Sequence, residues 1–149
     1  MDLNTIFHKE NCLVLQEKTK TEALIELMDN LLATKRATGE EELKREIFYR
    51  EQLMSTGIGM GIAVPHIRYK GVEQPVAALG VCPEGINDYE SIDGIPVNLV
   101  VMIVAGENQH KQHIRLLSQI MEKLKDESRR EALIKAAAGE EILKLIAGE

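Results

Sequence analysis

Apolar and polar positions along the first part of the chain predict a strand followed by a helix. Residues 12–15 form a short, unbroken apolar segment, which is typical of a strand that closes over a core. Thr19 and Glu22 then match a capping box, in which the two side chains satisfy free backbone donors at the start of a helix. Apolar residues follow at steps of three and four, so we expect the first helix over residues 20–33.

A second capping signal, Thr38 with Glu41, predicts the next helix. Its stripe at three- and four-residue steps has one charged member and consists of Leu43, Ile47, Arg50 and Met54. An arginine on a stripe that should be buried is unusual, because its charge needs an anion, a hydrogen-bonding partner or water. Two interpretations stay open: Arg50 belongs to a site, or its side chain reaches solvent from the end of the helix.

The middle of the chain alternates turn residues with apolar runs. Residues 76–82 lie between Pro75 and the sequence Pro-Glu-Gly at 83–85, which predicts a strand bounded by breakers. Residues 86–96 carry Asn, Asp and Gly and should form a loop or hairpin. The most apolar run, residues 97–104, is the best candidate for a central strand covered on both faces.

Three helices are expected after this strand. The first begins near Gln109 and has an apolar stripe of Ile114, Leu117, Ile120, Met121 and Leu124. A shorter helix stops around Gly139, and a last one ends at Gly148. Strands and helices thus alternate, and helices on either side of a small sheet make α/β the predicted fold class.

Length and charge narrow the possible functions. The 149 residues are the size of one ordinary domain, so we expect a single domain over residues 1–149. The 18 basic residues are scattered among 24 acidic ones, which argues against nucleic-acid binding. No apolar run approaches the ~20 residues that cross a bilayer, and the first residues are not a secretory signal, so we expect a cytoplasmic protein without membrane insertion.

Cys12 and Cys82 lie in apolar segments and should be buried, reduced thiols.

Candidate chemistry centres on a glycine-rich stretch in the first half of the chain. Gly57, Gly59 and Gly61 stand at alternate positions, and glycines so placed allow the backbone to approach another group closely. Pro65 fixes its own φ and favours extended geometry in the preceding residue. His66 is therefore expected where a strand ends.

Two further histidines, His110 and His113, fall in the first turn of the long helix, beyond the end of the strongest strand. Ligands of α/β sheets gather beyond strand ends, so these residues are candidates to share a site with His66. For His110 the alternative is an ordinary exposed polar residue. For His113, beside the apolar stripe, a functional and a structural role are equally open.

Several chemistries lack their sequence signature. The chain has no Gly-x-x-x-x-Gly-Lys-Ser/Thr motif for nucleotides and no Gly-x-Ser-x-Gly motif for acyl transfer. A zinc site made of His66, His110 and His113 is an alternative, but it lacks an obvious carboxylate ligand. A histidine beside glycine-rich backbone, with an arginine and a second histidine, suits a histidine nucleophile that takes a phosphoryl group.

These same residues resemble a known family. The shared motifs are Arg50-Glu51, S-T-G-I-G-M-G-I-A-V-P-H from Ser55 to His66, P-E-G at 83–85, D-G-x-P-V from Asp93 to Val97 and H-I-x-L-L from His113 to Leu117. Over nearly its whole length the chain is similar to the fructose/mannitol-type (type 2) enzyme IIA of the bacterial phosphoenolpyruvate-dependent sugar phosphotransferase system, whose members include nitrogen-regulatory proteins.

The resemblance implies a cytoplasmic phosphocarrier built as a mixed β-sheet sandwiched by α-helices, with no metal and no cofactor. His66 matches the family's phosphoryl acceptor, modified on Nε2, and His113 and Arg50 match residues that stabilise the group. The donor is phosphohistidine on HPr, and the acceptor is a cysteine of an enzyme IIB domain. In the regulatory relatives the phosphorylation state controls binding to a target protein instead. Met60 departs from the family pattern, because that position is often polar.

Physical chemistry explains why such residues are suitable. A neutral imidazole is a good nucleophile near pH 7, and the transferred group needs fixed donors and a cation around its oxygens. Arg50, the ring N–H of His113 and the backbone amides of Gly57, Gly59 and Gly61 are the predicted providers. The first turn of a helix favours an anion and disfavours imidazolium, so His113 should act as a neutral donor.

Overall fold

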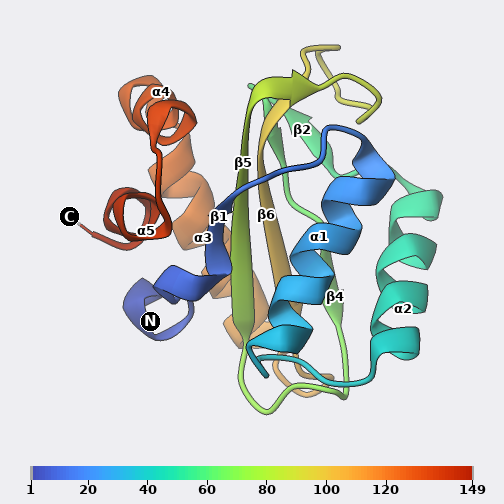
Figure 1. The fold of residues 1–149 in the computed structure, drawn as a ribbon. Helices are drawn as coiled ribbons and strands as arrows, with labels where there is room; N and C mark the ends of the chain where they lie inside the picture. The colour runs from blue at the N-terminus through green and yellow to red at the C-terminus, as the bar shows by residue number, and fades with distance from the viewer. Residues whose placement is uncertain (1, 149) are drawn as a thin grey trace.

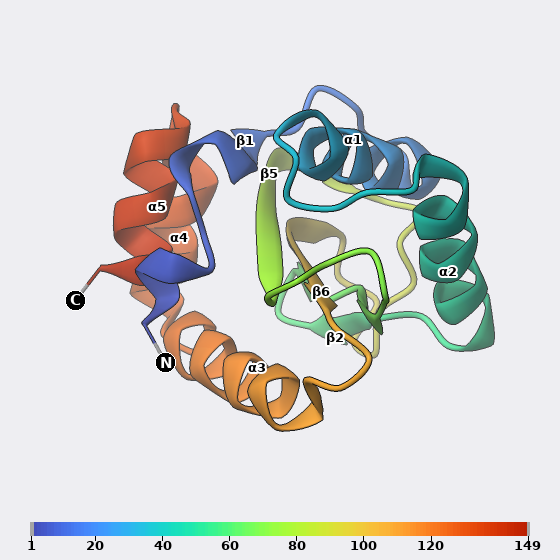
Figure 2. The same ribbon diagram turned by 90° about the horizontal axis from the view of Figure 1, so that it is seen from below.

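The computed structural model describes residues 2–148. A mixed six-stranded sheet lies between two layers of helices (Figure 1). Two helices, α1 and α2, cover one face, and three, α3 to α5, cover the other, as the view from below makes clear (Figure 2). The predicted α/β class, with a mixed sheet sandwiched by helices, is confirmed.

Two short 3-10 turns, Leu3–Thr5 and Lys9–Asn11, precede the first strand. The remaining elements are β1 (Cys12–Val14), α1 (Lys20–Ala33), α2 (Glu40–Leu53), β2 (Gly57–Gly59), β3 (Ile62–Ala63), β4 (His66–Arg68), β5 (Val76–Ile86), β6 (Val97–Ala105), α3 (His110–Leu124), α4 (Glu127–Lys135) and α5 (Gly139–Ala147). The first helix has its predicted bounds, and its predicted cap is present, since Thr19 accepts a hydrogen bond from the amide of Glu22. The last helix ends at its predicted C-cap, Gly148.

β6 is the centre of the sheet, and it pairs antiparallel with β5 and parallel with both β3 and β4. Ile62 lies opposite Leu99 and His66 lies opposite Ile103, so β3 and β4 follow one path along β6. Pro65 interrupts this path, because it has no N–H to donate, although its carbonyl accepts from Ile103 at 2.9 Å. His66 was predicted at the end of a strand but is the first residue of one, since pairing resumes directly after the proline.

Side chains of the central strand point alternately to the two helical layers. The core beneath α1 and α2 takes Val100, Met102 and Val104. The core beneath α3, α4 and α5 takes the residues between them, Leu99, Val101 and Ile103. Every residue of β6 except Asn98 is buried, which confirms the prediction of a central strand covered on both faces.

The two cysteines are buried free thiols, as predicted. Burial raises the pKa of the Cys12 thiol to about 12, so this thiol stays protonated at neutral pH. Among residues 2–148, no helix has both the length and the apolar character that a membrane span requires.

The predicted cap of α2 is wrong. The helix begins after Gly39, which has a φ of +81° and makes no side-chain cap. Thr38 instead turns its hydroxyl away from the helix and donates to the carbonyl of Gly71 at 3.3 Å. Tertiary contact with the following loop therefore overrides the local capping signal.

The predicted end of β5 is also wrong, because the strand runs past Cys82 to Ile86. Pairing with β6 becomes irregular over this stretch. Asn98 bridges it, since its side-chain amide donates to the carbonyls of Cys82 at 3.0 Å and Pro83 at 3.3 Å. A side chain of the neighbouring strand thus satisfies acceptors that regular pairing leaves open.

The buried stripes of α2 and α3 differ from the predicted ones by one residue at the ends nearest the site. In α2, Glu51 is buried, Arg50 is half-buried and Met54 is 70% exposed. In α3, Ile114 is 53% exposed, whereas its neighbour His113 is buried. Hydropathy assigns charged and polar residues to the surface, so it could not select Glu51 or His113 over their neighbours.

Candidate functional site

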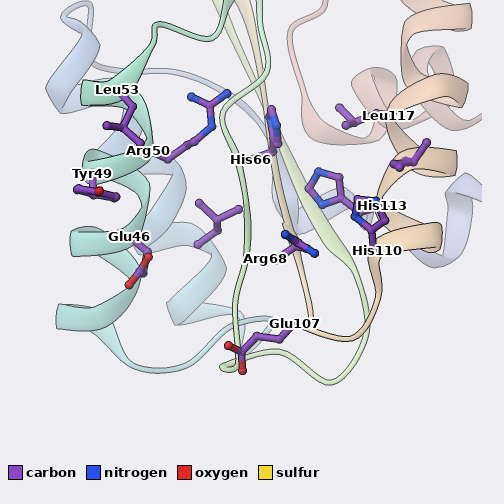
Figure 3. Close-up of a pocket in the computed structure, with 12 residues that line it drawn as sticks. Glu46, Tyr49, Arg50, Leu53, His66, Arg68, Glu107, His110, His113 and Leu117 are labelled. Carbon is purple, nitrogen blue, oxygen red and sulfur yellow. The ribbon is translucent and has the colours of Figure 1, made fainter.

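A pocket of about 690 Å³ lies between α2 and α3, over β4 (Figure 3). It brings together His66 from β4, Arg50 from α2 and His113 from α3, which the sequence predicted to share a site. His110 lines the same pocket. Three elements that are far apart along the chain therefore meet at one cavity.

The ring of His66 is held in one tautomer by the backbone. Its Nδ1 atom lies 2.7 Å from the carbonyl oxygen of Val64. A carbonyl oxygen only accepts, so Nδ1 carries the proton and donates it. Nε2 is then the nitrogen with the free lone pair, and it is the nucleophilic atom of this ring.

His113 lies directly beside this ring. The two ring centroids are 5.1 Å apart and the ring planes meet at 60° (Figure 3). The side chain of His113 is only 6% exposed, and its Nδ1 atom is buried without a hydrogen-bonding partner among residues 2–148. Burial, followed by the charges of His66, Arg68 and His110, lowers the pKa of His113 to about 4. His113 is therefore neutral at pH 7.

Arg50 extends from α2 toward the pocket (Figure 3). Its Nη1 atom donates to the carbonyl of Met54 at the end of the same helix, over 3.0 Å. A guanidinium has five N–H donors in a fixed fork, so this bond anchors the group and leaves other donors available. The arginine on the predicted core stripe is a half-buried, anchored cation at the pocket wall.

Sequence reasoning missed other residues of the pocket. Arg68 lies two residues after the acceptor candidate, so it shares the same face of β4 and adds a second cation. Two acidic residues, Glu46 and Glu107, also line the pocket. Exposed apolar side chains complete its edge, and they are Tyr49, Leu53 and Ile114. The period of two in the strand would have identified Arg68, whereas Glu107 follows β6 in a loop without a sequence signal.

The three glycines do not line this pocket; they pack against residues 90–98. A Cβ atom on Gly57 would lie 2.1 Å from the carbonyl oxygen of Glu90. Gly61 has a φ of +75°, and a Cβ there would lie 3.0 Å from Asn98. The expected close approach of backbone is therefore present, and its partner is another part of the chain. The role of the amides of Gly57, Gly59 and Gly61 as phosphate donors stays a prediction.

Met60 occupies the turn between β2 and β3 and does not line the pocket. Met60 and Gly61 have φ values of 59° and 75°, which define a two-residue hairpin of the type that favours Asn-Gly. The amide of Met60 donates to Asp93 at 2.8 Å, and this bond, followed by that from Ile95, holds the pKa of Asp93 below its usual value. The side chain that departs from the family pattern is thus turned to the surface.

The zinc alternative receives no geometric support. Although His66, His110 and His113 line one pocket, residues 2–148 contain no group of three or more potential ligands arranged to hold a metal ion. The arrangement that the pocket does provide is a nucleophilic nitrogen with two nearby cations and a neutral imidazole. Those are the parts that phosphoryl transfer requires.

Solved structures share this fold. The nitrogen regulatory protein IIA-Ntr from Neisseria meningitidis matches with a TM-score of 0.88 and 27% identity, over 97% of this chain and 98% of that one. A chain of the Escherichia coli complex of enzyme IIAMTL and phosphorylated enzyme IIBMTL matches with a TM-score of 0.80 and 29% identity, over 96% of this chain and 98% of that one. The fold is thus that of IIA-type phosphotransferase system proteins.

Comparison of sequences also identifies phosphotransferase system proteins. The fructose-specific EIIABC component of Bacillus subtilis is 35% identical over 132 residues, which is 89% of this chain and 21% of that protein. This chain therefore spans about a fifth of that relative. The family described as phosphoenolpyruvate-dependent sugar phosphotransferase system, EIIA 2, matches residues 5–148, and the chain belongs to this family.

Proposed function

We propose that this protein carries a phosphoryl group on Nε2 of His66. The group arrives from a phosphohistidine of HPr, as the phosphorus bond to the donor nitrogen breaks and a bond to Nε2 forms. It leaves to a cysteine of an enzyme IIB partner, as the bond to Nε2 breaks and a bond to sulfur forms. The observation that carries the proposal is the hydrogen bond from Nδ1 of His66 to Val64, because it directs the lone pair to Nε2.

The surrounding residues take separate roles in this proposal. Arg50 supplies positive charge to the phosphoryl oxygens from a position anchored by Met54. His113 supplies a neutral ring N–H, because its lowered pKa keeps it uncharged. The first turn of α3, which has no side-chain cap, adds a favourable dipole for an anion. The protein is then a phosphotransferase, and a cytoplasmic location is part of the proposal.

The test is transfer from phosphorylated HPr, generated with enzyme I and labelled phosphoenolpyruvate. We expect one phosphoryl group per chain, labile in acid and stable in base, on His66. His66→Ala should remain unlabelled while keeping its fold, and phosphorus NMR of the wild-type protein should report attachment at Nε2. A label that survives acid, or that persists in His66→Ala, would contradict the proposal.

A regulatory relay is the second candidate. It is favoured by the TM-score of 0.88 to a nitrogen regulatory protein, against 0.80 to the mannitol complex chain. In that case the phosphorylation state of His66 controls binding to a target protein, with no transfer to enzyme IIB. Mixing the phosphorylated protein with purified IIB domains separates the two, because rapid loss of label to a IIB cysteine supports the carrier in sugar uptake. Retained label, with a target captured from only one phosphorylation state, supports the relay.

A further inference from the structure

A buried carboxylate stands next to Arg50 on α2. Glu51 is only 6% exposed, yet both of its carboxyl oxygens accept hydrogen bonds. It accepts from the amide of Thr56 at 2.9 Å and from the hydroxyl of Thr56 at 2.8 Å. The ammonium of Lys20 lies 3.1 Å from the same carboxylate. A charge this deep is retained only where its bonds are good, so Thr56 is held by two strong acceptors.

Tyr89 makes further contacts with both Thr56 and Lys20. Thr56 gives its only hydroxyl proton to Glu51, so the hydroxyl of Tyr89, 2.7 Å away, must donate to Thr56. Burial and the neighbouring charge of Glu51 raise the pKa of Tyr89, which keeps this donor protonated. The ammonium of Lys20 also lies 4.7 Å from the centre of the Tyr89 ring. The resulting network is fully satisfied, and such networks specify one arrangement.

Hydrogen bonds connect this network to the nucleophile. The carbonyl of Thr56 accepts from the amide of Val64 at 3.0 Å. The carbonyl of Val64 in turn accepts from Nδ1 of His66 at 2.7 Å. Glu51 therefore holds Thr56, and Thr56 is bonded to Val64. The carbonyl of Val64 in turn sets the tautomer of the His66 ring.

The same segment also leads to Arg50. Met54, whose carbonyl anchors the guanidinium, lies two residues before Thr56. The chain between Glu51 and Thr56 is short, and both of its ends are fixed by the carboxylate itself. One buried side chain thus restrains the anchor of the cation and the anchor of the nucleophile together.

We propose that Glu51 is a positioning residue for phosphoryl transfer, which acts through Thr56 and Val64 to keep His66 in its Nδ1–H tautomer. Glu51 makes no contact with the phosphoryl group. Its effect on transfer rate rests on the proposed function, whereas its effect on the tautomer does not. The two are therefore separable by experiment.

The test is Glu51→Gln in the full chain, a change that keeps the shape but removes the charge and one acceptor. Nitrogen-15 NMR of the imidazole should show the Nδ1–H form of His66 dominant in the wild type and mixed with the Nε2–H form in the variant. The turnover rate with phosphorylated HPr should fall on the order of ten- to a hundredfold, as when outer partners of an oriented histidine are removed. The KM for HPr should not change, because the docking face is untouched.

Glu26→Gln is the matched control. Glu26 is also a helical carboxylate that accepts backbone amides, from Gln16 at 3.0 Å and from Glu17 at 3.2 Å, but these amides lie outside the segment that leads from Thr56 to His66. Its loss should lower the melting temperature without altering the His66 tautomer or the transfer rate. A shift of the tautomer in Glu26→Gln equal to that in Glu51→Gln would reject a specific role for Glu51.

Each remaining outcome is informative. An unchanged tautomer in folded Glu51→Gln overturns the inference, whatever happens to the rate. If the single variant does not fold, Lys20→Met with Glu51→Gln removes both charges, leaves no unpaired ammonium, and should show the same tautomer shift. If wild-type protein takes no phosphoryl group at all, the proposed function fails, and the tautomer comparison still decides the role of Glu51.

Discussion

Two polar side chains are buried on the two helices that flank the pocket, and they differ in how their hydrogen-bonding capacity is used. Glu51, on α2, accepts from an amide, a hydroxyl and an ammonium. His113, on α3, keeps a ring nitrogen without a partner among residues 2–148. A satisfied group stabilises one backbone arrangement, while an unsatisfied one carries a cost that is accepted where a ligand or a reaction needs it. Glu51 on α2 is therefore a fixed support behind the pocket, whereas His113 on α3 retains free binding capacity in its lining.

The largest expected effect comes from removing the carboxylate of Glu51, whose hydrogen-bonding capacity is satisfied. Glu51→Ala should lower the free energy of unfolding by about 3–5 kcal/mol, because it leaves the amide of Thr56 without its acceptor and removes the buried partner of the Lys20 ammonium. Urea unfolding at pH 7 measures this. A loss below about 1 kcal/mol, as for an exposed ion pair, would show that the network is not a structural support.

The next effect comes from removing His113, which has a ring nitrogen without a partner among residues 2–148. His113→Ala should still accept one phosphoryl group at His66 but pass it on more slowly, on the order of ten- to a thousandfold, as for other positioned donors. His110→Ala, which changes a pocket residue without an assigned role, should transfer normally. If His113→Ala prevented labelling while His66→Ala retained it, the two histidines would have to exchange roles.

The lowered pKa of His113 also makes the stability of the folded protein depend on pH, which Glu51 is not needed to explain. The pKa of His113 is about 4 in the folded protein against 6.5 for a free histidine. The unfolded chain therefore binds more protons at this residue between those values, so the folded protein loses stability as pH falls through this window. The loss is complete below pH 4 and absent above pH 6.5. His113→Gln should flatten the wild-type curve in this range, and parallel curves would contradict the lowered pKa.

The smallest effect concerns Met60, which does not line the pocket. Its φ of 59° is unfavourable for a methionine and acceptable to asparagine. Met60→Asn should therefore raise the free energy of unfolding by about 0.5–1 kcal/mol, on the scale of other changes that match a residue to its backbone conformation. Met54→Asn is the control, because Met54 is exposed with extended backbone and should give no gain.

The sequence predicted those features that follow from local chemistry or from a specific motif. The capping box at Thr19 located α1, because nothing in the fold competes with that bond. The Pro-His and His-x-x-Leu-Leu motifs singled out His66 and His113, and the fold brings these two residues to one pocket.

Features that depend on tertiary partners could not be predicted. Thr38 is drawn from its cap by a loop that lies 33 residues later in the chain. The continuation of β5 depends on Asn98 in the neighbouring strand. The burial of Glu51 depends on Lys20, which belongs to another helix. Sequence spacing contains no information about such pairings, so it placed Arg50 on the stripe in place of its buried neighbour.

His66 belongs to a strand, and this has a consequence for the entropy of each encounter. Its backbone pairs with Ile103 of the buried central strand, and its ring is tied to Val64. The nucleophile is therefore ordered once, when the chain folds, and little of its freedom remains to be lost when a partner docks. Under the proposed function, donor and acceptor must each orient their own reactive group toward a stationary nitrogen, so differences in transfer rate between partners should originate in the partners.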